Sequence, residues 1–148
     1  MVFTKRIAAV GGDKITFRGG IMFINDKAVK LEYLGPYTYQ ENEKFIKTHM
    51  YKETLPNGIS YKVLYDNHPI QNSLGFTETF IVPKDHFFMV GDNRDHSEDS
   101  RNFISFVPKE YIRGRVFYIL FSNGNGSTLN IYKIFKGMKW SKCFTWIK

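Results

Sequence analysis

The chain has 148 residues, of which 43% are hydrophobic and 17% aromatic, and its formal net charge is +7. This size fits one domain with a substantial core, and the hydrophobic fraction excludes an intrinsically disordered chain. The positive charge favours an anionic partner, either nucleic acid or an acidic lipid surface. No stretch approaches the ~20 apolar residues of a membrane-spanning helix, and residues 1–20 lack the apolar core of a targeting peptide.

Short apolar runs separated by glycine, asparagine and aspartate predict antiparallel hairpins over the first part of the chain. The runs are 7–10, 15–17, 21–24 and 28–31, and the turns between them are 11–13, 18–20 and 25–26. Residues 35–56 fit either a strand or a helix, and the pattern does not decide between them.

The later part of the chain continues the β pattern. After the turn at 56–58, the alternating Ile59, Tyr61, Val63 and Tyr65 predict one apolar face of a strand. The remaining expected elements are a loop at 66–78, a hairpin with strands at 80–82 and 86–90, and core strands at 106–108 and 116–121. The predicted fold class is therefore mostly β, an antiparallel barrel or sandwich.

The C-terminal tail differs in character, because lysines recur about every three residues among aromatic and aliphatic residues from 131 to 148. This spacing indicates either a basic amphipathic helix on a membrane surface or a terminal segment packed on the barrel. We divide the chain into a β domain over 1–122, with a hairpin insertion around 25–78, and a basic aromatic tail over 123–148.

The densest polar segment is 91–101, which holds four acids, two arginines and two serines directly after the apolar run 87–90. A strand that ends in such a loop typically carries a functional site on that loop. The alternative is a solvated turn stabilised by Asx hydrogen bonds. A calcium loop is a further alternative, but it is not favoured, because the glycine at loop position six is absent and Arg94 and Arg101 lie within the segment. The four histidines show no metal-ligand spacing, so no metal site is predicted.

A second candidate is Lys5, which is followed by the apolar run 7–10. A lysine acts as a general base only when burial destabilises its ammonium form, and a neutral amine in reach of a serine can then take the serine's proton. Spacing alone would indicate a solvated charge at the start of a strand.

Residues 5–13 and 91–101 together resemble two signature motifs of type I signal peptidases, membrane-anchored serine proteases that use a Ser–Lys pair. The resemblance extends from Lys5 to about Phe121. It implies that Lys5 is the general base and that the hydroxyl of Ser97 orients it. It also implies supporting roles, with Asp99 and Arg101 as a buried ion pair that fixes the loop and Asp92 as a structural partner of Arg6.

Two positions depart from the family pattern, since Ala9 stands where a glycine is expected and Gly11 where a proline is expected. The family's serine nucleophile lies upstream of the lysine, whereas only four residues precede Lys5 and none is serine. We therefore expect that this chain alone does not cleave preproteins, and that an N-terminal part with the anchor and nucleophile has been lost.

By resemblance, the complete enzyme removes signal peptides from preproteins on the outer face of a bacterial inner membrane, without a cofactor and with lipid as a second partner. One alternative is a non-catalytic basic β domain that binds nucleic acid or membrane, but the acidic loop would repel phosphates, so no nucleic acid is expected. Another is an inactive paralogue that keeps the fold and binds preproteins or membrane.

Overall fold

The computed structural model describes residues 2–41, 44–69, 77–102, 105–120 and 143–147, and the chain divides into two compact units, Met1–Arg113 and Gly114–Lys148. The described residues form antiparallel strands and turns, and the one helical segment among them is the 3₁₀ turn η1 (Lys109–Tyr111). The predicted fold class, mostly β, is confirmed. The expected domain limits stay a prediction.

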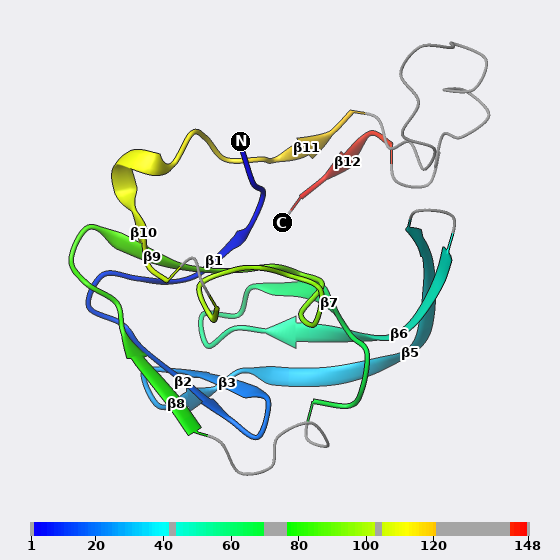
Figure 1. Ribbon diagram of the computed structural model, residues 1–148, viewed down its shortest axis with the longest axis horizontal. Helices are drawn as coiled ribbons and strands as arrows, with labels where there is room; N and C mark the ends of the chain where they lie inside the picture. Colours follow the sequence, from blue (N-terminus) through cyan, green and yellow to red (C-terminus); the bar gives the residue numbers. More distant parts are fainter. Residues whose placement is uncertain (1, 42–43, 70–76, 103–104, 121–142, 148) are drawn as a thin grey trace. The chain divides into compact units, whose positions relative to one another are not determined.

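One sheet of the first unit has the strand order β4-β3-β2-β8 (Figure 1). Its strands are β2 (Lys14–Arg18), β3 (Ile21–Ile24), β4 (Lys27–Ala28) and β8 (Thr77–Ile81). Asn25 and Asp26 both have positive φ, at 49° and 64°, so the β3–β4 connection uses the residue types that tolerate this backbone in tight hairpins. The hairpins predicted around the turns 18–20 and 25–26 are therefore formed, whereas the run 7–10 pairs with 86–90 and not, as predicted, with 15–17.

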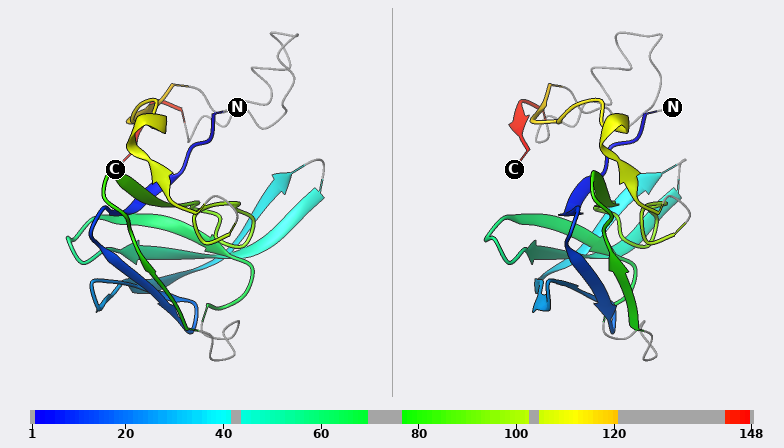
Figure 2. Two further views of the ribbon diagram at one scale, coloured as in Figure 1. Left: turned by 60° about the vertical axis from the view of Figure 1, so that its left-hand side comes forward. Right: turned by 90° about the vertical axis from the view of Figure 1, so that its left-hand side faces the viewer.

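A second sheet has the order β5-β6-β7, with β5 (Lys30–Glu41), β6 (Lys44–Thr54) and β7 (Ser60–Tyr65). The segment 35–56, which the sequence left open between strand and helix, is thus extended. Figures 1 and 2 show the β5–β6 pair reaching out from the rest of its unit. Ile59 was expected on the inner face of β7, but it precedes the strand and is exposed, because it belongs to the turn that closes against Leu55.

The third sheet pairs β1 (Arg6–Val10) with β9 (His86–Val90), and β9 with β10 (Val107–Pro108). A bulge between Ile7 and Ala9 makes Ala8 the extra residue of β1, so the adjacent Ala8 and Ala9 are both buried.

The predicted hairpin of 80–82 with 86–90 is wrong, because β8 pairs with β2 while β9 pairs with β1. The chain passes between two sheets at Val82, whose amide and carbonyl bind the backbone of Asp13 and Gly12. A Cβ on Gly11 would lie 2.9 Å from the Pro83 carbonyl oxygen, so this crossing needs a glycine on the opposite turn.

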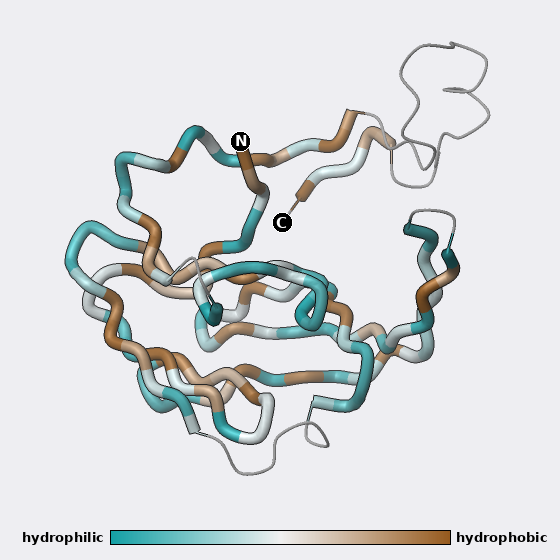
Figure 3. Tube along the Cα trace, in the orientation of Figure 1, coloured by the Kyte–Doolittle hydropathy of each residue, from teal (hydrophilic) through white to brown (hydrophobic). Residues whose placement is uncertain are grey.

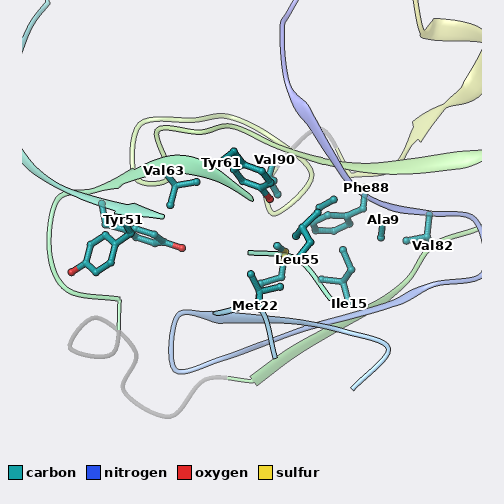
Figure 4. Packing of buried hydrophobic residues seen from close by; sticks show 13 residues of the cluster. Ala9, Ile15, Met22, Tyr51, Leu55, Tyr61, Val63, Val82, Phe88 and Val90 are labelled. Atoms are coloured by element: carbon teal, nitrogen blue, oxygen red, sulfur yellow. The ribbon is translucent and has the colours of Figure 1, made fainter. Parts of the chain in front are cut away.

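Side chains from all three sheets meet in one core, in which Ile15, Val63, Phe88 and Val90 are fully buried (Figure 4). The ring of Phe88 lies 5.2 Å from that of Phe80, centroid to centroid. Figure 3 shows the contrast between the hydrophobic β9 and the hydrophilic loop that follows it. The core therefore fixes β9, and with it the start of the polar loop.

In the second unit, β11 (Tyr118–Ile119) pairs with β12 (Thr145–Trp146). The Trp146 ring packs 5.0 Å from that of Tyr118, centroid to centroid. The helix proposed for the tail is not seen in residues 143–147, which form a turn and β12. Residues 131–142 and Lys148 lie outside the described residues.

Candidate active site

The structure brings Lys5 and Ser97 together. Lys5 directly precedes β1, and Ser97 lies in the polar loop between β9 and β10. Because Arg6 pairs with Val90 in the β1–β9 ladder, Lys5 is held beside the start of that loop. Its Nζ donates a hydrogen bond of 2.6 Å to Oγ of Ser97, and both side chains are half-buried.

Gly91 packs directly against the Ser97 side chain of this contact. A Cβ at this position would lie 2.0 Å from Oγ and 2.5 Å from Cβ of Ser97, and 3.6 Å from Nζ of Lys5. The Ser97 side chain therefore occupies the space that any larger residue at 91 would need. The sequence marked Gly91 only as the start of the loop, so its role in packing was missed.

The expected pair of Asp99 and Arg101 is present inside the loop. Nε and Nη2 of Arg101 donate to the two carboxylate oxygens of Asp99 at 2.8 Å each, and the Gly91 amide donates to Oδ2 at 2.8 Å. Burial by itself would raise the pKa of Asp99, but the bonds from Arg101 and Gly91 outweigh it and hold that pKa below its usual value. Asp99 thus links the end of the loop to the residue beneath Ser97.

The structure also joins Arg6 to Asp92. Nε and Nη2 of Arg6 each donate to one carboxylate oxygen of Asp92 at 2.9 Å, in the two-pronged geometry of strong arginine–carboxylate pairs. Burial would lower the pKa of Arg6, but the Asp92 carboxylate more than compensates and raises it. This pair joins β1 to the loop next to the Lys5–Ser97 contact, since Arg6 directly follows Lys5 and Asp92 directly follows Gly91.

Sequence reasoning missed a buried pair beneath the loop. Arg94 and Glu53 are 3% and 1% exposed, and Nη2 of Arg94 donates to Oε1 of Glu53. Burial would lower the pKa of Arg94, but Tyr65 and Glu53 outweigh it and raise it. The one signal was the position of Glu53 between Tyr51 and Leu55, which places a charge on the inward face of β6.

His96, the one histidine of the loop, is exposed and its Nε2 lies 2.8 Å from Oδ2 of Asp66. In the described part of the chain, no group of three or more histidine, cysteine or acidic side chains is arranged to hold a metal ion. The contacts at and around Lys5 and Ser97 are those of an amine with a hydroxyl and of the two ion pairs, Arg6–Asp92 and Arg101–Asp99.

Comparison with known proteins agrees with these motifs. Residues 1–121 match the model of the family "Signal peptidase, peptidase S26". The chain belongs to the S26 signal peptidase family. The S26 match ends at 121, where the resemblance found from the two motifs also ends.

Among similar proteins are the signal peptidases I of Rickettsia canadensis, 39% identical over 125 residues, and of Rickettsia akari, 40% identical over 124 residues. Each alignment covers 81% of this chain and 46% of the relative. The chain thus spans about half the length of the curated signal peptidases that it matches. S26 is a family of serine peptidases, and the described residues contain no helix with the length and apolarity needed to cross a membrane.

Proposed function

We propose that this chain carries the general-base half of a signal peptidase I active site, with Lys5 as the base and Ser97 as the hydroxyl that orients it. The observation that supports this most is the 2.6 Å hydrogen bond between Nζ and Oγ of two residues that are 92 positions apart. A neutral amine that donates one hydrogen to Ser97 keeps its lone pair for a proton from a nucleophile.

The reaction proposed for the complete enzyme is hydrolysis of a peptide bond. A serine hydroxyl gives its proton to Nζ of Lys5 as its oxygen attacks the scissile carbonyl carbon. Lys5 then returns the proton to the leaving amine when the C–N bond breaks. The signal peptide is then held as an ester of the serine, and water, deprotonated by Lys5 in the same way, attacks its acyl carbon. The C–O bond to the serine breaks, the serine oxygen takes the proton back from Lys5, and the signal peptide leaves with a free carboxylate.

The nucleophile in this proposal is a serine outside the 148 residues, and we infer that the chain by itself does not cleave preproteins. Removing the nucleophile of a serine protease leaves only the small rate that binding and the remaining groups supply. A preprotein incubated with this chain should therefore stay intact.

We place the enzyme on the outer face of a bacterial inner membrane, with preprotein signal peptides and lipid as its partners. Val2 and Phe3 support lipid contact, because they are 77% and 61% exposed and lie just ahead of Lys5. Large exposed apolar side chains beside a site are typical of a membrane-facing or protein-facing surface. Binding of the chain to lipid vesicles should weaken in a V2S/F3S variant, and unchanged binding would remove this part of the proposal.

The catalytic proposal is tested in an extended protein, the chain joined at Met1 to the part of the Rickettsia canadensis signal peptidase I that lies N-terminal to the matched segment. Ser97→Ala should slow cleavage of a preprotein by roughly 10²-fold, a usual contribution of acid–base positioning, with the unfolding midpoint unchanged. The matched control is Ser60→Ala, which removes the hydrogen bond between the hydroxyls of Ser60 and Thr54. Because this change lies away from the reacting atoms, the cleavage rate should stay within about twofold of the parent rate.

A folded Ser97→Ala protein that cleaves at the parent rate would refute the assignment. An unfolded Ser97→Ala protein would make Ser97 a structural residue instead.

A further inference from the structure

Among the described residues, Glu53 is the most deeply buried acid that the two motifs do not include. It lies on β6, is 1% exposed, and accepts hydrogen bonds at Oε1 from Nη2 of Arg94 and from the hydroxyl of Tyr61, both at 2.5 Å. Burial, and next the charge of Glu53, raise the pKa of Tyr61, so the phenol stays a donor. Two chains of contacts lead from this carboxylate to the Lys5–Ser97 pair.

The first chain of contacts runs through the polar loop. Nε of Arg94 donates to the carbonyl of Gly91 at 3.2 Å, and the Arg94 amide donates to the carbonyl of Leu64 at 2.9 Å. The Arg94 carbonyl in turn accepts a 2.6 Å bond from Nη2 of Arg101. Glu53 therefore holds, through Arg94, the residue on which the Ser97 side chain rests.

The second chain of contacts runs through β1. The Tyr61 ring, fixed at its hydroxyl by Glu53, lies 3.7 Å from the guanidinium carbon of Arg6, measured to the ring centroid. This is a close cation–π contact, and Arg6 directly follows Lys5. Glu53 therefore also supports the strand that carries the lysine.

We propose that Glu53 is a positioning residue for the Lys5–Ser97 contact, acting on Ser97 through Arg94 and on Lys5 through Tyr61 and Arg6. Its meaning for catalysis rests on the function proposed above for Lys5 and Ser97. A buried ion pair adds little net stability compared with apolar residues of the same volume, because both charges lose their hydration. An orienting role accounts for the pair better than stability does.

The test measures how strongly Lys5 is held, using the chain as it is. The chain is treated briefly with acetic anhydride, and acetylation of Lys5 relative to the exposed Lys27 is read by mass spectrometry of its peptides. Ser97→Ala sets the ratio for a released lysine. Glu53→Gln should raise the Lys5 ratio by about threefold or more, within the range of coupling between contacting residues.

Glu32→Gln is the matched control, since Glu32 forms an exposed ion pair with Lys52 on the same sheet and the ratio should stay at the parent value. Because Glu53→Gln leaves Arg94 buried without a counter-charge, Arg94→Lys is the second variant. It keeps a cation beside Glu53 but removes the guanidinium bond to Gly91, and the ratio should again rise.

A folded Glu53→Gln or Arg94→Lys chain with the parent ratio would overturn the proposal. If neither variant folds, the pair is structural and the positioning role is rejected. The readout does not depend on cleavage, so it separates the two claims. Failure of Ser97→Ala to slow the extended protein refutes the proposed function, whereas an unchanged Lys5 ratio refutes only the role of Glu53.

Discussion

Gly91→Ala is the substitution whose effect on the site follows most directly from the geometry. Ordinary van der Waals contact begins at 3.4 Å, whereas the new Cβ would lie 2.0 Å from Oγ of Ser97. Rotation about χ1 of Ser97 would move Oγ but not its Cβ, which is only 2.5 Å away. The loop backbone at Ser97 must therefore retreat by about 1 Å, with a cost of roughly 1–3 kcal/mol in unfolding free energy, as for other overpacked sites.

A displacement of this size breaks the 2.6 Å bond between Nζ of Lys5 and Oγ of Ser97. Misplacing a catalytic group by about 1 Å can lower the rate of the chemical step by roughly 10²-fold. In the extended protein, we expect Gly91→Ala to fold. Its unfolding free energy, measured in urea, should fall by roughly 1–3 kcal/mol, which is the overpacking cost. It should cleave a preprotein about 100 times more slowly than the parent.

The control is Gly114→Ala, because a Cβ there meets nothing within 4 Å and the backbone needs no positive φ. It should leave both stability and cleavage rate near the parent values. A Gly91→Ala protein with parent stability and parent rate would refute the reasoning, since Ser97 would then not be held against Gly91.

Two further predictions concern the ion pairs of the loop. The pKa of Asp99 is lower in the folded chain than in the unfolded chain, so its ionised form stabilises the fold above about pH 4, and this stabilisation disappears as the pH falls through the folded value. Asp99→Asn should therefore cost about 3 kcal/mol at pH 7, measured by urea unfolding, and the difference from the parent should shrink in acid; a constant difference would contradict it. Arg6→Lys removes the two-pronged contact with Asp92 and the stacking on Tyr61. Because the pair is partly exposed, the unfolding free energy should fall by about 1 kcal/mol. A fall of more than about 3 kcal/mol would indicate a buried, structural pair instead.

Much of the fold could be predicted from local patterns. The turns at 25–26 and 56–58 contain residues that tolerate positive φ, and the alternation at 61–65 gives the inner face of β7. Pairing between strands was less accessible. The strands at 77–81 and 86–90 follow each other along the chain, but each pairs with a distant strand. The backbone hydrogen bonds of Val82 and the close approach of Gly11 to Pro83 account for the crossing between them.

The candidate site was likewise predictable only in part from the sequence. The two motifs named Lys5 and Ser97, and the structure places them in contact although 92 positions separate them. Glu53 could not be assigned from the sequence, because its partner Arg94 is 41 positions away and a strand pattern shows only which face a residue occupies, not what it meets. A charged residue on an otherwise apolar face is the signal that deserved a search for a partner.

The central claim is that Lys5 is the general base, and the most direct test is the rate of preprotein cleavage by the extended protein with Lys5→Ala. The control is Lys27→Ala, at an exposed lysine of β4. We predict that Lys5→Ala reduces cleavage to background while the protein stays folded, and that Lys27→Ala cleaves at the parent rate. Cleavage near the parent rate by a folded Lys5→Ala protein would contradict the account.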